Sequence, residues 1–365
     1  MKTRRPHATG GSDPVAENAM AAPKKVNLLT YRRLSVGMGL LGQVADIRES
    51  SVTLSLPNNL TGHVSYLELS ERHAAAAVDD GGEGDANAKP AEPDEPLRPG
   101  ALVAVGDLVR CVVVNLHRSR GHAHVDVSLR ACLVNAGMNS NSLVPGLGVS
   151  GAVDSVEDHG YTVDLGIAGT TGFMRFGDAE SRTWNLGKPV ECVVKETKRK
   201  ANRDVVLLTA RRDEVAKATI RDFPGLSLAS LQAGMLVNVQ VESVLNSGIT
   251  VAFLRHFVGV VDIFHLLDGC VSADKACWPD QSDNLPARIL YVDQVNKVIG
   301  LTLKSNLVRL TGGHLPSSAS VGTTFESAQV VRADAVLGLC LALPGTEVCT
   351  GFAHVSRISD GHIDK

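Results

Sequence analysis

The chain has 365 residues, of which 44% are hydrophobic and only 4% aromatic, and its length predicts more than one domain. Its 36 basic and 39 acidic residues give a formal net charge of −3. This balance excludes a protein that coats nucleic acid through overall positive charge, so any RNA contact must come from local basic loops.

Cysteine spacing and hydropathy exclude two further classes of protein. The seven cysteines are scattered without a Cys-x-x-Cys pair, which argues against a zinc site and is typical of a reducing compartment. The longest late apolar run, residues 336–343, is too short to span a membrane. We therefore expect no metal or other cofactor, no membrane association and no small-molecule substrate.

The N-terminal residues 1–33 are polar and basic without periodicity and are expected to be disordered. A plan of glycine-led strands then occurs four times. The opening glycines are Gly37, Gly146, Gly234 and Gly322, at intervals of 109, 88 and 88 residues. The first interval is 21 residues longer because residues 79–99 form an insertion with seven acidic side chains, which we expect to be a flexible loop.

Strand signals fill these repeats, and helical signals are weak. The best helical candidate, residues 213–222, links the second and third repeats. Apolar residues alternate with polar ones, as in half-buried strands. The alternating sets are Val52, Leu54 and Leu56; Val125, Val127 and Leu129; Tyr161, Val163 and Leu165; and Ile249, Val251 and Phe253.

Two motifs suggest a dinucleotide site and a metal site, but the residues around them do not favour either function. Residues 37–42 and 146–151 match Gly-x-Gly-x-x-Gly, but period-two strands follow them where dinucleotide binding requires a helix. We interpret these glycines as bends at the entrance to small barrels. His122 and His124 share one strand face, but no third metal ligand is near them in the sequence, so a solvated or RNA-facing pair is favoured.

The closing half of the pattern reads Gly-Phe-Ala-His-Val-Ser at residues 351–356 and Gly-Phe-Met-Arg-Phe at residues 172–176. It resembles the S1 RNA-binding domain, a five-stranded OB-fold barrel, over nearly all of residues 34–365. The resemblance implies an all-β tandem array of S1-type OB-fold five-stranded barrels, the fourth incomplete. The expected segments are repeat one at 34–132 including the acidic insertion, repeat two at 145–212, a partly helical linker at 213–231, repeat three at 232–305 and a truncated repeat four at 320–365.

Repeats one and three carry a narrower resemblance. The Pro-Asn-Asn-Leu-Thr-Gly motif at 57–62 and residues 248–262 are similar to the N-terminal repeats of a eukaryotic family of rRNA biogenesis proteins. That resemblance implies a nucleolar, non-enzymatic factor that binds precursor rRNA and ribosome assembly factors, and a chain that lacks the family's helical tail. Two alternatives stay open. The chain could be a protein-interaction array of OB barrels with little RNA binding, or a translation factor like ribosomal protein S1.

The S1 resemblance also implies where RNA would bind. The positions that carry stacking residues in the family fall on Ser50, Thr53 and Ser65 in repeat one; His159, Thr162 and Arg175 in repeat two; Ser247, Thr250 and Asp262 in repeat three; and His354 in repeat four. The loop between the last two strands is a second RNA-facing element of OB-folds. It supplies Lys195, Lys198, Arg199, Lys200 and Arg203 in repeat two and Arg118 and Arg120 in repeat one, but only Asn296 and Lys297 in repeat three.

Overall fold

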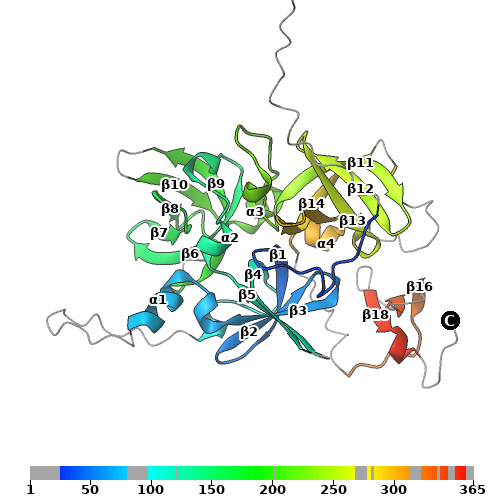
Figure 1. The fold of residues 1–365 in the computed structure, drawn as a ribbon. Coiled ribbons are helices and arrows are strands. Elements are labelled where there is room, and N and C mark those ends of the chain that lie inside the picture. Colours follow the sequence, from blue (N-terminus) through cyan, green and yellow to red (C-terminus); the bar gives the residue numbers. More distant parts are fainter. Residues whose placement is uncertain are drawn as a thin grey trace, which may run out of the picture.

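The computed structural model describes residues 25–79, 98–119, 122–181, 183–199, 203–267, 278–280, 283–311, 322–334, 338–343 and 350–358. These residues form three five-stranded barrels and one three-stranded sheet (Figure 1). The all-β prediction is confirmed. Among the described residues, no helix combines the length and apolar character needed to cross a membrane.

Each barrel has the same strand plan, with the first strand closing onto the fourth. Repeat one contains β1 Gly39–Ile47, β2 Ser51–Leu56, β3 Leu60–Ser65, β4 Leu108–Ser119 and β5 His122–Ser128. Repeat two contains β6 Gly148–Glu157, β7 Gly160–Asp164, β8 Thr170–Arg175, β9 Pro189–Lys198 and β10 Asp204–Thr209. Repeat three contains β11 Leu236–Leu245, β12 Gly248–Phe253, β13 Phe257–Asp262, β14 Asn284–Asp293 and β15 Val298–Thr302.

Helices are short and lie between these strands. They are α1 Glu71–Asp79, α2 Ala131–Val134, α3 Arg212–Lys217 and α4 Ser305–Val308. The helix expected at 213–222 is therefore shorter than predicted, because the backbone turns extended at Ala218 and Thr219 then bridges to Leu236. Repeat four contributes β16 Gln329–Asp334, β17 Gly338–Ala342 and β18 Thr350–His354. Of the acidic insertion at 79–99, residues 80–97 lie outside the described residues, whereas Asp79 ends α1 and Pro99 begins the 3-10 turn Pro99–Ala101.

The opening glycines mark the entrance to each repeat. Gly37, Gly146, Gly234 and Gly322 have φ angles of 84°, 88°, 81° and 94°, a region that L side chains rarely adopt. In the three complete barrels the glycine N–H donates to a carbonyl of the fourth strand at 2.7–2.8 Å. The bend and this bond together start barrel closure, so these glycines lie where the chain turns into each barrel, as interpreted from the sequence.

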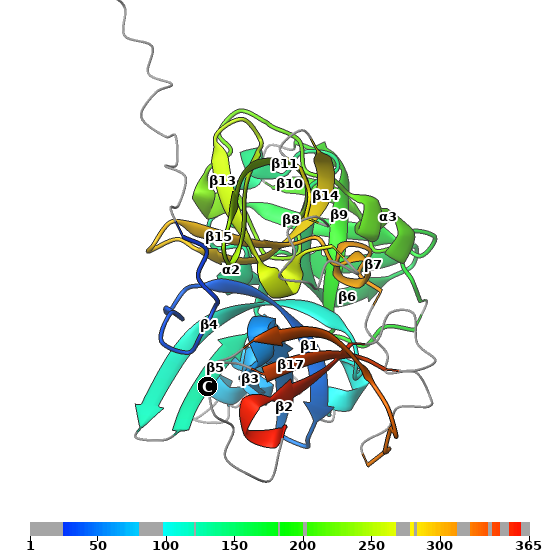
Figure 2. The ribbon, with the colours of Figure 1, turned by 90° about the vertical axis from the view of Figure 1, so that its right-hand side faces the viewer.

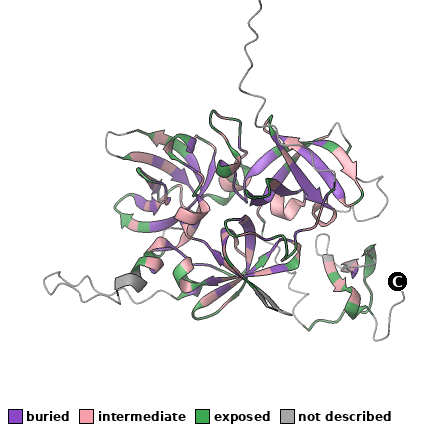
Figure 3. Cartoon of the chain, in the orientation of Figure 1, coloured by how far each residue is buried: buried purple, intermediate pink, exposed green. Residues whose placement is uncertain are grey.

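The alternating residues predicted from the sequence are buried, and buried positions run along the strands of the barrels (Figure 3). The four sets named above are 0–5% exposed. Each first strand also carries a bulge directly after a valine, at Val44, Val153, Val241 and Val330. This shared irregularity gives an unambiguous register for comparing the four repeats.

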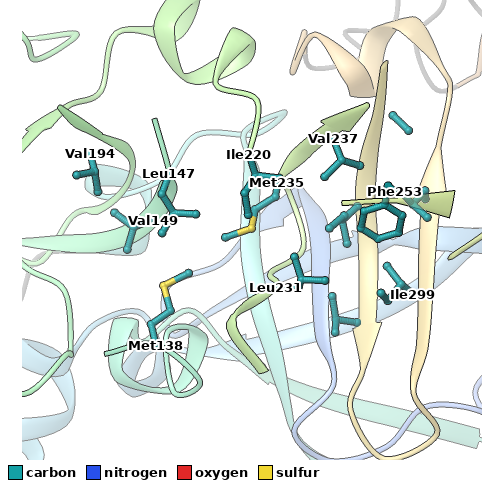
Figure 4. Close-up of a cluster of buried hydrophobic side chains, with 14 of the residues drawn as sticks. Met138, Leu147, Val149, Val194, Ile220, Leu231, Met235, Val237, Phe253 and Ile299 are labelled. Carbon is teal, nitrogen blue, oxygen red and sulfur yellow. The ribbon is translucent and has the colours of Figure 1, made fainter. Parts of the chain in front are cut away.

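The three complete repeats pack against one another and share contacts between their barrels. Residues Gly39 and Leu40 of β1 pair with Val292 and Tyr291 of β14, which joins barrels one and three into a ten-stranded sheet. The apolar cores of repeats two and three are continuous through the segments that connect them (Figure 4). The bridging side chains are Met138, Ile220, Leu231 and Met235.

A buried arginine ties all three barrels together. Arg110 of β4 is 6% exposed and lies 2.9 Å from the carboxylate of Glu191 on β9. Its Nη1 donates to the carbonyl of Gly148 at 3.1 Å and to Oε1 of Gln232, the first residue of repeat three, at 2.8 Å. Gln232 in turn donates to Asn135 in the link between repeats one and two. One side chain of repeat one therefore contacts both other repeats.

The N-terminal segment differs from its prediction. Residues 25–33 fall in the stretch expected to be disordered, but Val26 and Leu29 are 1% and 4% exposed. The carbonyl of Val26 accepts from Ser247 in repeat three, and the Tyr31 hydroxyl accepts from the N–H of Thr61 in repeat one. These buried apolar residues hold the segment across barrels one and three.

Candidate nucleic-acid interface

The outer face of the third strand differs between repeats at one equivalent position. The strand registers place Thr53 opposite His63, Thr162 opposite Phe173, Thr250 opposite Val260 and Cys340 opposite Phe352. A planar ring therefore occupies this position in repeats one, two and four, and an aliphatic side chain occupies it in repeat three. Planar rings on an OB-fold sheet are platforms on which nucleic-acid bases stack.

In repeat two the ring is Phe173 on β8. Its neighbours Gly172 and Met174 are buried, so the strand period of two places Phe173 and Arg175 on the outer face together. His159 is exposed in the turn between β6 and β7, and its carbonyl accepts from the N–H of Phe176 just after Arg175. Phe173 and Arg175 thus share one outer face, with a ring for stacking and a guanidinium for a phosphate or base, and the exposed turn that carries His159 adjoins the end of this face.

The basic turn of repeat two lies at the other end of this surface. β10 runs parallel to β8 with Asp204 opposite Thr170, so the turn adjoins the start of β8 while Arg175 is its last residue. Five strand steps separate the two ends, about 17 Å. The basic turn therefore lies at the opposite end of β8 from Arg175, and a strand of several nucleotides is long enough to contact both.

Several cations of this turn already have partners. The Lys195 ammonium is 2.5 Å from the Asp178 carboxylate and 4.0 Å from Glu214, and Lys198 is 3.9 Å from Glu196. Arg199 donates to the Asn141 side chain at 2.9 Å. Arg203 is exposed, and Lys200 lies outside the described residues.

The candidates in the other repeats are less well defined. Arg118 lies near the end of β4, and Arg120 lies outside the described residues. The β4–β5 hairpin that carries Arg118 projects beyond its barrel (Figure 2). His354 is exposed at the end of β18, where its Nδ1 accepts from the N–H of Ser356.

Repeat one presents a histidine cluster that the sequence did not predict. His63 of β3 and His124 of β5 stack with centroids 4.4 Å apart and planes 10° apart. Nε2 of His124 is 2.8 Å from the Asp126 carboxylate, and Nε2 of His117 is 3.3 Å from it. Burial, then the nearby His124, lowers the pKa of His63, so its ring is neutral at pH 7. The stacked pair of rings is a flat platform of the kind that bases favour.

The same cluster raises the question of whether His124 could bind a metal. His63 and His117 lie beside it in space, although no third ligand is near it in the sequence. Stacked rings do not converge their nitrogen lone pairs on one point, which metal coordination requires. Within the part of the chain that the structure describes, no group of three or more His, Cys, Asp or Glu side chains is arranged to hold a metal ion.

The described residues of repeat three leave no equivalent open surface. Val260 and Asp262 are 6% and 8% exposed. The Asp262 carboxylate accepts from the Asn58 side chain of repeat one at 3.0 Å and from the N–H of Phe264 at 2.9 Å. Thr250 is fully buried, and its hydroxyl is hydrogen-bonded to the Ser243 hydroxyl. The positions that the S1 resemblance assigns to RNA in this repeat are therefore occupied by contacts within the chain.

Asn58 explains the Pro-Asn-Asn-Leu-Thr-Gly motif. The motif forms the turn between β2 and β3, a 3-10 turn at Pro57–Asn59, and Asn58 and Asn59 adopt left-handed φ angles of 58° and 60°. Asparagine tolerates this conformation better than most residues. The turn directs the Asn58 amide onto repeat three, so the motif is an inter-repeat contact.

Sequence reasoning missed Phe173 and His63 as ring positions. The signal was present in the alternation, since Met174 and Val64 are the inward residues that place their neighbours outside. No sequence signal brings His117, His124 and Asp126 to His63, because β3 and β5 are more than 50 residues apart and meet only through the barrel.

Comparisons with known proteins agree with this geometry. A family model described as the RRP5 S1 domain matches residues 34–129. The rRNA biogenesis protein RRP5 of Arabidopsis thaliana is 34% identical over 330 residues, which is 88% of this chain and 16% of that protein. The human protein RRP5 homolog is 33% identical over 301 residues, covering 79% of this chain and 15% of that protein. The chain thus spans about a sixth of the length of these curated relatives.

Proposed function

Because the chain is an RRP5-like protein built of S1 repeats, we propose that it is a non-enzymatic RNA-binding scaffold of ribosome biogenesis. It would bind precursor rRNA and ribosome assembly factors, in the nucleus and nucleolus, where rRNA is made and processed. Its relatives bear the name of rRNA biogenesis proteins, and this assignment rests on that similarity together with the surfaces described above.

One observation carries the RNA-binding part of the proposal. Repeats one and two leave a ring platform open at the equivalent position, with His63 stacked on His124 and Phe173 beside Arg175. Repeat three replaces the ring by a buried valine and covers the surface with Asn58. Aromatic stacking with nearby cations is how OB-folds hold single-stranded nucleic acid without reliance on overall charge.

The test is fluorescence anisotropy of the full chain with a labelled single-stranded RNA of about 12 nucleotides. Removing one stacking ring costs about 1–3 kcal/mol, so Phe173→Ala should weaken binding roughly 5- to 150-fold. Lys297→Ala, in the short loop of repeat three, is the matched control and should leave affinity unchanged. Equal affinity of wild type and Phe173→Ala would exclude repeat two as the RNA surface.

A protein-interaction array is the second candidate, and one observation favours it. The acidic partners of Lys195, Asp178 and Glu214, neutralise part of the basic surface of repeat two. If the full chain shows no saturable RNA binding at low salt, the open faces of repeats one and two become protein-docking surfaces in place of RNA platforms.

A further inference from the structure

The ring platform of repeat one contains a carboxylate. Strands β3, β5 and β4 lie side by side, and Asp126 of β5 is opposite His63 on one flank and Asn115 on the other. Val125 and Val127 are 1% and 0% exposed, so the strand period of two places Asp126 on the outer face. Its negative charge therefore lies directly beside the histidine rings.

The equivalent positions of the other two complete barrels are uncharged. Leu207 lies opposite Phe173 in the parallel pair of β10 and β8, as Asp126 lies opposite His63 in the pair of β5 and β3. In repeat three the same position falls on Gly300. The carboxylate is thus a feature of repeat one and does not follow from the strand plan that the barrels share.

One oxygen of the Asp126 carboxylate is available to accept from an external donor. Its Oδ1 is 2.8 Å from Nε2 of His124. Its Oδ2 is 3.3 Å from Nε2 of His117, but that nitrogen is closer, at 2.9 Å, to the side-chain nitrogen of Asn115. The Asn115 side-chain oxygen accepts from the N–H of Leu116 at 2.9 Å, which orients the amide nitrogen toward His117. An imidazole nitrogen that accepts from Asn115 carries no proton to donate to Oδ2.

The geometry of this site favours a base over a phosphate. The planes of His63 and His124 are 10° apart and their centroids 4.4 Å apart, so a base stacked on either ring lies nearly parallel to both. The carboxylate of Asp126 lies at the edge of the His124 ring and therefore faces the edge of a stacked base, where the hydrogen-bonding groups are. Its charge repels phosphate oxygens and attracts N–H donors.

We propose that repeat one selects guanine in single-stranded RNA and that Asp126 determines this choice, an inference that rests on the RNA-binding function proposed above. The Watson–Crick edge of guanine presents two adjacent donors, N1–H and the exocyclic amine, and a carboxylate accepts from both. Adenine and cytosine present one amine beside a ring nitrogen that is itself an acceptor, and the N3–H of uracil is flanked by two carbonyls. Repeat two, with Phe173 beside Leu207, stacks on any base.

The experiment measures fluorescence anisotropy of the full chain carrying Phe173→Ala, so that repeat one dominates binding. The probes are labelled uridine RNAs of about 12 nucleotides with one central guanine, adenine, cytosine or inosine. The guanine RNA should bind about tenfold more tightly than the adenine RNA, a typical discrimination by a bidentate pair. Inosine keeps N1–H but lacks the exocyclic amine, so its RNA should fall between these two.

Two further variants separate base readout from a general effect of charge. Asp126→Asn should bring the guanine and adenine RNAs to nearly equal affinity, because a neutral amide, itself half donor, no longer favours two adjacent donors. Glu49→Gln removes the same charge from an exposed turn of repeat one and should leave the ratio of the two affinities unchanged. Circular dichroism of both variants verifies that the barrel is folded.

The outcomes distinguish this inference from the proposed function. Equal affinity for all four RNAs, or a guanine preference that persists in Asp126→Asn, would overturn the inference and leave RNA binding by the chain intact. Loss of all binding in Phe173→Ala, when the wild type binds, would show that repeat two alone is the RNA surface and would also overturn it. Absence of saturable binding by the wild type would remove the proposed function itself, and the inference with it.

Discussion

Replacing Arg110 by alanine should uncouple the three barrels. The change leaves the Glu191 carboxylate, the Gln232 side chain and the Gly148 carbonyl without the donor they share. Removing one partner of a buried ion pair costs about 3–5 kcal/mol. Because the Glu191 side chain is 25% exposed, we expect the lower end of this range, about 3 kcal/mol.

The two tryptophans allow the coupling itself to be measured. Trp184 lies in repeat two and Trp278 in repeat three. Urea unfolding is followed by fluorescence in backgrounds carrying either Trp184→Phe or Trp278→Phe, so that each curve reports one repeat. With Arg110 present the two curves should coincide, since a shared core and a shared arginine join the barrels.

With Arg110→Ala both curves should shift to lower urea, and they should separate. Glu191→Ala alone and Glu191→Ala combined with Arg110→Ala complete a double-mutant cycle. We expect this cycle to give a coupling energy between Arg110 and Glu191 of about 1–3 kcal/mol. Coincident curves with an unchanged midpoint in Arg110→Ala would refute the reasoning, because they would show that the buried network carries no inter-repeat coupling.

Three other predictions follow from the remaining surfaces. Replacing Lys198, Arg199 and Lys200 together by alanine should reduce the steepness of log affinity for single-stranded RNA against log salt by about 2, if each cation contacts a phosphate. The loss of affinity between 50 and 200 mM salt should then be about 18-fold smaller than for the wild type. An unchanged slope in anisotropy titrations would exclude this turn as an RNA contact. Burial lowers the pKa of His73 below its usual 6.5, so as the pH falls the unfolded chain binds a proton at this histidine before the folded chain does. The free energy of unfolding measured in urea should therefore fall as the pH drops below about 6.5. The variant His73→Gln should reduce that pH dependence. Asn58→Gly keeps the left-handed backbone but loses the amide on repeat three, and should cost about 1–3 kcal/mol of unfolding free energy, a loss that the same measurement would detect.

Much of the fold follows from local sequence pattern. Alternation at Val52 and Leu54 identifies the inward face of a strand, because side chains of a strand point to opposite sides with period two. The spacing of Gly37 and its equivalents gives the repeat unit, because only glycine adopts the φ needed at that bend at little cost. Both signals act within a few residues and are readable in one chain.

The contacts between repeats could not be predicted in this way. Arg110 lies in a strand of apolar residues, and nothing near it in the sequence indicates Glu191 or Gln232 as partners. Asn58 reaches Asp262 across 204 positions. The candidate site shows the same division, since the alternation around Phe173 indicates an outward ring, whereas the stack of His63 on His124 exists only once the barrel has closed.

The pairing of β1 with β14 has a consequence for synthesis of the chain. Leu40 meets Tyr291, which the ribosome adds roughly 250 residues later. At about 5–20 residues per second, this delay is on the order of 12–50 s. Barrel one can close on its own hairpin during that time, but its edge at Gly39 and Leu40 waits unpaired for its final neighbour. The nascent chain therefore displays a strand edge for far longer than a barrel takes to fold, and this is the stage at which it would be most open to mispairing or to a chaperone.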